Sequence, residues 1–178
     1  MEQKVILVDD RDNAVGLEGK MEAHRNGDLH RAVSVYIFDS SGRLMLQQRA
    51  RGVYHSGLLW SNTCCTNCYE GESAQDSAHR SLRNEMGFDC ELKEAYSITY
   101  RTQVSNGLME HEFLHIFFGM HDGDPEPDGN EVMDWKWIGL DELEKDIVAN
   151  SSTYTPWLKI ILESGRLRKE ADRFLGSG

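Results

Sequence analysis

Two glutamates, Glu110 and Glu112, are separated by one residue in an apolar stretch that runs on to Met120. Side chains two apart in a β-strand point to the same face, so we expect both carboxylates on one side, with His111 and Phe113 on the other. Burying carboxylates without partners costs several kcal/mol, so a metal ion, a set of cations or solvent must compensate them. An edge strand facing water is the simpler explanation, but the apolar residues that follow argue against it.

Cysteines are the second group that could do chemistry, and three of the four are clustered. They are Cys64, Cys65, Cys68 and Cys90. This distribution differs from the evenly spread framework of a disulfide-stapled secreted domain, which favours free thiols or metal ligands. A lone cysteine is most often a small buried hydrophobic residue. Cys65 and Cys68 also have the spacing of a thiolate zinc site, although the sequence has no second such pair.

Composition limits the class of partner. With 178 residues, 39% of them hydrophobic, the chain fits one domain with one proper core. A net charge of -11 and a pI of about 5.0 argue against nucleic acid or anionic lipid as partners, whereas a small anion needs local cations and metal ions. No signal-like start or bilayer-length apolar run is present, which predicts a cytoplasmic protein without membrane insertion. The sequence does not indicate an oligomeric state.

The elements that must position these residues form a mixed α+β domain, with a sheet covered by helices. Apolar and β-branched segments predict strands at 5–8, 33–38, 44–47, 91–103, 108–121 and 135–138. Asn106-Gly107 predicts the turn between the fourth and fifth of these. A capping-box start at Ser73, apolar residues four apart and a stop at Gly87 predict a helix. Further helices are expected at 18–24 and about 156–175, and the acidic stretch 122–130 is expected to be a surface loop.

A loop and helix over residues 66–88 resemble the latter part of a Nudix box. The matching residues are Glu72, Arg80, Leu82, Glu85, Gly87 and Phe88. The hydrolase form of the box has a glycine where Thr66 stands and glutamates where Ser81 and Asn84 stand. A pyrophosphohydrolase is therefore disfavoured.

The segment Trp60-Ser-Asn-Thr-Cys-Cys65 resembles the cysteine-bearing loop of type I isopentenyl diphosphate isomerases. The resemblance covers almost the whole chain in order, through Lys20, His24, His30, Gln48-Arg49, Tyr100-Arg101, Glu110-His-Glu112, Glu131 to Trp135 and Thr155-Pro-Trp157. The chain is thus identified as a divergent member of that family, which implies a Nudix fold in one domain over residues 1–178 and a small-molecule isoprenoid diphosphate as substrate.

The resemblance implies that the enzyme moves a double bond from isopentenyl diphosphate to give dimethylallyl diphosphate. One proton is added and another is removed from a neighbouring carbon, which two acid/base groups on opposite faces can do. The family's roles fall on Cys65 and Glu112, with Tyr100 placed to relay the proton. Trp157 would offer its ring to a carbocation, although anchoring the last helices in the core is an equally good explanation.

The resemblance also implies two divalent metals. The ligands expected at the first site are His24, His30, Asn67, Glu110 and Glu112, and Glu85 is expected to hold a magnesium ion that bridges to the diphosphate. Asn67 stands where the family has a third histidine. We expect its carbonyl oxygen to favour manganese or magnesium over zinc at the first site.

The cations expected around the diphosphate are Lys20, Arg49, Arg51 and Arg83. The first two match the family, but Val53 and Ser81 replace a lysine and an arginine. Losing two charged hydrogen bonds weakens binding by roughly 3 to 6 kcal/mol, so we expect Arg51 and Arg83 to substitute. Three alternatives stay open, of which Asn67, Val53 and Ser81 motivate the first and the missing glutamates disfavour the second. They are an isomerase or cyclase of the same fold for a larger or diphosphate-free isoprenoid, a Nudix diphosphate hydrolase, and a non-catalytic binding protein.

Overall fold

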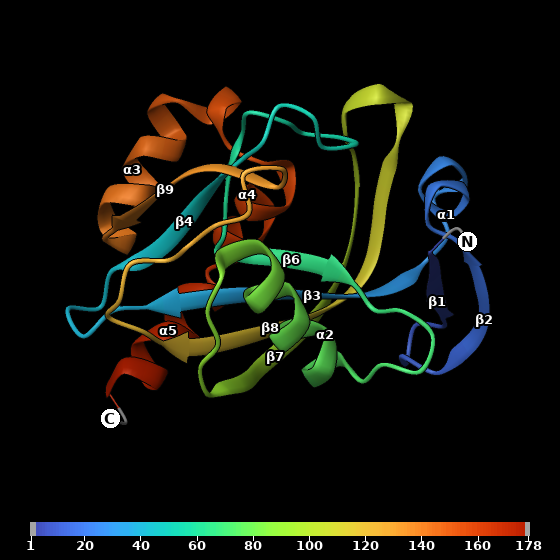
Figure 1. Cartoon of the computed structure of the whole chain (residues 1–178), viewed down its shortest axis with the longest axis horizontal. Coiled ribbons are helices and arrows are strands. Elements are labelled where there is room, and N and C mark those ends of the chain that lie inside the picture. The colour runs from blue at the N-terminus through green and yellow to red at the C-terminus, as the bar shows by residue number, and fades with distance from the viewer. Residues whose placement is uncertain (1–2, 177–178) are drawn as a thin grey trace.

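The computed structural model describes residues 3–176, and over that range nine strands form one mixed sheet (Figure 1). The strands are β1 Lys4–Val8, β2 Ala14–Gly19, β3 His30–Phe38, β4 Leu44–Arg49, β5 Trp60–Ser61, β6 Cys64–Asn67, β7 Leu92–Gln103, β8 Met109–Met120 and β9 Val132–Ile138. Strand β3 is central, because it pairs in parallel with β8 and antiparallel with β1 and β6. Strand β4 joins it at Phe38 and Leu44 and carries β5 and β9.

Helices cover both faces of the sheet, and each face has its own core. They are α1 Lys20–Asn26, α2 Ala74–Ser81, α3 Leu140–Ala149, α4 Pro156–Glu163 and α5 Arg166–Gly176. Tyr36 and Phe38 of β3 pack with α3, α4 and α5, whereas Val33 and Val35 pack on the other face with α2. Burial on both faces explains why β3 is apolar almost throughout. Between residues 3 and 176, no helix has the length and apolarity that a bilayer span requires.

Most of the predicted elements are confirmed, including all six strands, the C-terminal helices and the turn at Asn106, which has a left-handed φ of 63°. The predicted helix at 18–24 begins later, at Lys20, because Glu18 belongs to β2 and pairs with Val5. Strand β2 is mostly exposed, so it lacks the alternation that marks a strand. Helix α3 was missed, although its buried residues Leu140, Leu143 and Ile147 have helical spacing.

The Nudix-like helix is fixed at both ends. Ser73 and Asp76 form the predicted capping box at the start of α2, which continues into a π-helical turn, Leu82–Met86. Gly87 then reverses the chain with a φ of 76°. The acidic loop, which is irregular as expected, donates backbone hydrogen bonds from Glu126 to Met86 (2.9 Å) and from Asp128 to Glu85 (3.0 Å). These bonds hold the turn that carries Glu85.

Replacing Gly87 with alanine tests this docking. A Cβ at residue 87 would overlap the carbonyl oxygen of Glu126, in a backbone conformation that disfavours side chains. We expect Gly87→Ala to lower the free energy of unfolding by more than about 2 kcal/mol, measured by urea denaturation. Gly129→Ala is the control, since no described atom lies within 4 Å of its added Cβ. Equal stability of Gly87→Ala and the parent chain would contradict the docking.

Candidate active site

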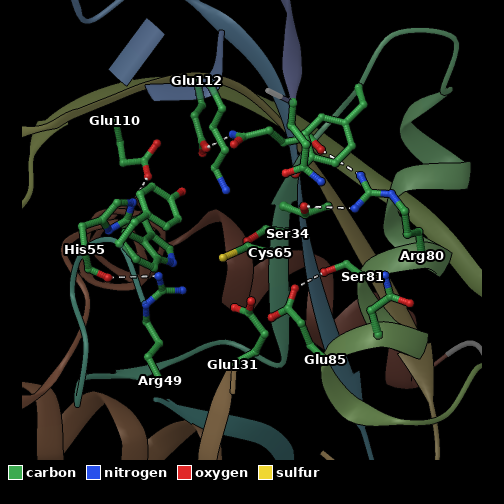
Figure 2. A pocket seen from close by; sticks show the side chains of 18 of the residues that line it. Ser34, Arg49, His55, Cys65, Arg80, Ser81, Glu85, Glu110, Glu112 and Glu131 are labelled. Atoms are coloured by element: carbon green, nitrogen blue, oxygen red, sulfur yellow. Dashed lines mark hydrogen bonds and ion pairs between the residues drawn. The ribbon is translucent and has the colours of Figure 1, made fainter. Parts of the chain in front are cut away.

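A cavity of about 220 Å³ opens beside the central strands, and side chains distant in sequence converge on it (Figure 2). Its wall includes Ser34 of β3, Cys65 of β6, Tyr100 of β7, and Glu110 and Glu112 of β8. The Cys65 sulfur faces the open centre in Figure 2. Strands β6 and β8 both pair with β3, which brings the cysteine and the two carboxylates to one cavity.

The two glutamates of β8 lie on the same face, as their spacing predicts. Glu110 and Glu112 are 4% and 8% exposed, and the Tyr100 hydroxyl donates to Glu112 Oε2 at 2.7 Å. Burial and the charge of Glu110 raise the pKa of Glu112 well above its usual value. Burial alone would raise the pKa of Glu110 too, but the neighbouring imidazoles His24 and His55 lower it well below the usual range. The two neighbouring carboxyl groups therefore have pKa values shifted in opposite directions.

Two fully buried histidines face these carboxylates. His24 Nε2 and His30 Nε2 lie 3.3 Å and 3.9 Å from Glu110 Oε2, and His30 Nε2 lies 3.8 Å from Glu112 Oε1. Burial lowers the pKa of His30 to about 4. At neutral pH His30 is therefore an uncharged imidazole, which is the form that binds metal.

Backbone hydrogen bonds orient both rings. The Nδ1–H of His24 donates to the carbonyl of Lys20 at 2.6 Å, and that of His30 donates to the carbonyl of Asp28 at 2.8 Å. Each bond consumes the Nδ1 proton and leaves the Nε2 lone pair directed at the carboxylates. In metal sites, a hydrogen bond from the ring nitrogen that does not bind the metal fixes the tautomer of the histidine.

The cluster fits a divalent metal. Ligand atoms of His24, His30 and Glu110 lie within 4.8 Å of one another. Within the described chain, neither Nε2 atom nor Glu110 Oε2 has a hydrogen-bond partner, although all are buried. Buried polar atoms without partners are rare and costly, and a cation among them removes the cost. Imidazole nitrogen with carboxylate oxygen is a donor set that binds divalent transition metals.

Asn67 lies at the edge of this cluster, as expected. Its amide nitrogen lies 3.4 Å from Glu112 Oε1, and its buried Oδ1 has no partner among residues 3–176. Sequence reasoning missed a further member, His55, in the loop between β4 and β5. This side chain is 2% exposed, and its Nε2 lies 2.6 Å from Glu110 Oε1. No periodicity or motif marks position 55, so only the folded loop identifies it.

Cys65 pairs with Ser34 of β3, and alternation along β6 places Cys64 in the opposite core. Burial raises the pKa of the Cys65 thiol far above its usual value, against the opposing charge of Arg49. The side chain is therefore a protonated thiol at neutral pH. Cys68 is fully buried in that same opposite core, which does not support a shared thiolate metal site with Cys65.

The side chain of Asn62 ties the cysteine-bearing loop to its neighbouring elements. Its buried amide donates to Ser34 Oγ (3.0 Å), to the carbonyl of Val35 (3.2 Å) and to the carbonyl of Cys64 (2.7 Å). Its Oδ1 accepts from the indole N–H of Trp157 at 3.3 Å. One side chain thus joins β3, the cysteine loop and α4, and so positions the Cys65 thiol.

Two of the four expected diphosphate cations line the cavity. Lys20 Nζ lies 4.0 Å from the centre of the Tyr54 ring, and the Arg49 guanidinium lies 5.3 Å from the centre of the Trp157 ring. Trp157 is 3% exposed, packs in the core as one explanation expects and also lines the cavity, while its role towards a carbocation stays a prediction.

The other two expected cations do not reach the cavity in the part of the chain that the structure describes. Arg51 is exposed, and Arg83 pairs with Asp89 at 2.6 Å near the surface, because position 83 of the π-helical turn faces solvent. Arg80 lines the cavity instead and pairs with Glu72 at 2.6 Å. The sequence marked Arg80 as part of the Nudix-like motif, but it did not indicate that this side chain lines the cavity.

Glu85 stands in the wall away from the imidazoles. Ser81 Oγ donates to Glu85 Oε1 at 2.5 Å, and Gln47 Nε2 donates to Glu85 Oε2 at 2.8 Å. Burial raises the pKa of Glu85 to about 7. Glu131 lies beside it in Figure 2, facing the same space as Cys65. Ser81, at the position of a family arginine, thus holds the carboxylate in place.

Comparison with known proteins agrees with this geometry. A NUDIX domain matches residues 28–158. "Isopentenyl-diphosphate Delta-isomerase 2" of Aromatoleum aromaticum is 56% identical over 92% of this chain and 86% of its own, and the Burkholderia multivorans "Isopentenyl-diphosphate Delta-isomerase" is 46% identical over 94% and 95%. A Deinococcus radiodurans crystal structure aligns with a TM-score of 0.74 at 16% identity, covering 90% of this chain and 98% of that one. The last of these comparisons concerns the fold alone.

Metal removal tests the buried cluster. We expect chelator-treated protein to gain thermal stability when Mn²⁺ or Zn²⁺ is added, because the ion binds only the folded cluster. At 100 times the dissociation constant the gain is about 2.7 kcal/mol. Glu110→Gln removes the charge on which the imidazoles converge and should abolish most of the shift. A melting temperature of the parent chain that does not respond to either ion would contradict the site.

Proposed function

The chain belongs to the NUDIX family and, within it, to the isopentenyl-diphosphate Delta-isomerases, and on that premise we propose that Cys65 and Glu112 are its proton-transferring pair. It isomerises isopentenyl diphosphate, a small-molecule isoprenoid diphosphate, to dimethylallyl diphosphate. The observation that carries the proposal is that a protonated thiol and a buried carboxyl, from strands that both flank β3, face one cavity. A cytoplasmic location stays a prediction.

The reaction needs one proton added to the terminal alkene carbon and another removed from the methylene beside the double bond. Cys65 and Glu112 serve the two faces, so that one gives a proton while the other takes one. Tyr100 touches Glu112 at Oε2, which places it to hold that carboxyl and relay its proton. Positive charge that develops between these steps faces the ring of Trp157, whose indole N–H is fixed on Ser61 at 2.9 Å.

Metals complete the charge balance. His24, His30, Glu110, Glu112 and Asn67 would hold manganese or zinc, which offsets the negative charge of the buried carboxylates. Glu85, apart from that cluster, would hold magnesium for the diphosphate, with Lys20 and Arg49 as further positive charges. These residues would bind and orient the substrate diphosphate beside the Cys65 thiol.

Hydrolysis of the diphosphate is not supported by the same wall. A Nudix hydrolase uses several helix carboxylates, but Ser81 and Asn84 stand beside Glu85 at two of those positions. Ser81 is already engaged with Glu85. Among the described residues, the helix therefore contributes one carboxylate, Glu85, to the cavity wall, which suits anchoring of the diphosphate better than activation of a water molecule.

Solvent isotope incorporation tests the proton-transferring pair. In deuterated water with Mg²⁺ and Mn²⁺, the parent chain should convert isopentenyl diphosphate to product that carries deuterium. Removing an acid/base group should slow this by about 10²- to 10⁴-fold, so Cys65→Ala and Glu112→Gln should each lose most product. Cys90→Ala, outside the cavity wall, is the matched control and should retain the rate. Normal turnover by Cys65→Ala would refute the assignment.

The magnesium role of Glu85 makes a separate prediction. Glu85→Gln keeps the side-chain shape but removes the charge, so the Mg²⁺ concentration for half-maximal activity should rise at least about tenfold, or about 1.4 kcal/mol. Titration of activity with Mg²⁺, at fixed Mn²⁺, measures this. Glu126→Gln, an exposed carboxylate outside the cavity wall, is the control. An unchanged Mg²⁺ requirement in Glu85→Gln would exclude the role.

A further inference from the structure

Three imidazoles, not two, converge on Glu110. His24 Nε2 lies 3.3 Å from one carboxylate oxygen, and His55 Nε2 lies 2.6 Å from the other. We propose that His55 is a ligand of the divalent metal. It supplies a third imidazole in place of the family histidine, where this chain has Asn67. The inference rests on the metal site proposed above and adds to it a residue from a different element.

The loop between β4 and β5 is built to point His55 inward. The Arg49 guanidinium donates to the carbonyl of His55 at 3.1 Å, and the Ser56 backbone N–H donates to Ser105 Oγ at 2.8 Å. Ser56 has a left-handed φ of 52°, as does Leu58 at 70°. Non-glycine residues in this region cost about 1 to 3 kcal/mol each and persist where the surroundings enforce them. The side chain so placed is 2% exposed.

The contacts of the two ring nitrogens leave Nε2 of His55 available to a cation. His55 Nδ1 lies 3.1 Å from Ser56 Oγ, so that hydroxyl occupies one ring nitrogen. Nε2 makes no hydrogen bond of acceptable geometry within residues 3–176, despite its short separation from Glu110. A buried ring nitrogen without a hydrogen-bond partner is costly, and a cation bound by both Nε2 and the Glu110 carboxylate would remove that cost.

Several other unpaired buried atoms of the described chain belong to residues of the same cluster. They include His24 Nε2, His30 Nε2, Glu110 Oε2 and Asn67 Oδ1. The ring centroids of His24 and His55 are 6.1 Å apart, and the Nε2 atoms of both rings contact the Glu110 carboxylate. Asn67 contributes one neutral oxygen from β6, a weaker donor than imidazole for transition metals. The loop histidine restores the nitrogen that β6 lacks.

The test compares metal binding by variants, without any activity assay. Chelator-treated protein is titrated with Co²⁺, followed by its visible spectrum, and with Zn²⁺ against a competing chelator. His55→Ala should lower the affinity at least about tenfold and change the Co²⁺ spectrum, because a nitrogen donor is lost. The double variant His55→Ala with Asn67→His should regain both. His79→Ala, whose imidazole pairs with Asp89 outside the cavity, is the matched control and should behave as the parent chain.

Three outcomes would overturn the inference, and they differ in whether they also refute the metal site itself. Parental affinity and spectrum in His55→Ala would show that residue 55 is not a ligand, while the metal site itself stands. Weaker binding with an unchanged number of nitrogen donors, measured by X-ray absorption, would show that His55 only positions Glu110. Failure of the parent chain to bind Co²⁺ or Zn²⁺ would remove the metal site as well. Circular dichroism of each variant checks that the fold is retained.

Discussion

Two carboxylates lie buried side by side on β8, and the rest of the site follows from what compensates them. Glu110 and Glu112 share one face of the strand within a largely apolar sheet. Buried charge of this kind is tolerated only with cations or hydrogen bonds beside it. The histidines supply nitrogen, Tyr100 supplies a hydroxyl to Glu112, and the cluster fits a divalent ion that would balance the charge. A group able to exchange protons is thereby held in the wall of the cavity.

Strand β3 is the element that turns separate motifs into one site. It begins at His30, opposite Glu112 of β8, and pairs Ser34 with Cys65 of β6. The thiol therefore reaches the cavity from one side of the strand and the carboxyl from the other. Because β3 is buried on both faces, it cannot shift without exposing two cores, so the register that relates these groups is strongly fixed.

Neighbouring residues compensate in part for the positions at which this chain departs from the family pattern. Ser81 lacks the charge of an arginine but holds Glu85 by a short hydrogen bond. Arg80 lines the cavity, although much of its charge is shared with Glu72. Asn67 leaves the metal cluster short of one imidazole, and the loop after β4 brings His55 to the same carboxylate. The cavity thus keeps charged side chains at the proposed metal sites, while few cations line it for the diphosphate.

Sequence by itself determined the parts that depend on local spacing. Alternation along a strand placed Glu110 and Glu112 on one face, and the capping box at Ser73 marked the start of α2. The order of motifs identified the family and predicted the roles of Cys65 and Tyr100. Tertiary structure alone decided which loop residues turn inward. His55 enters the cluster and Arg51 does not, although they are four residues apart, because a loop's direction depends on contacts such as that of Ser56 with Ser105. Such contacts join residues 49 positions apart, and no local periodicity encodes them.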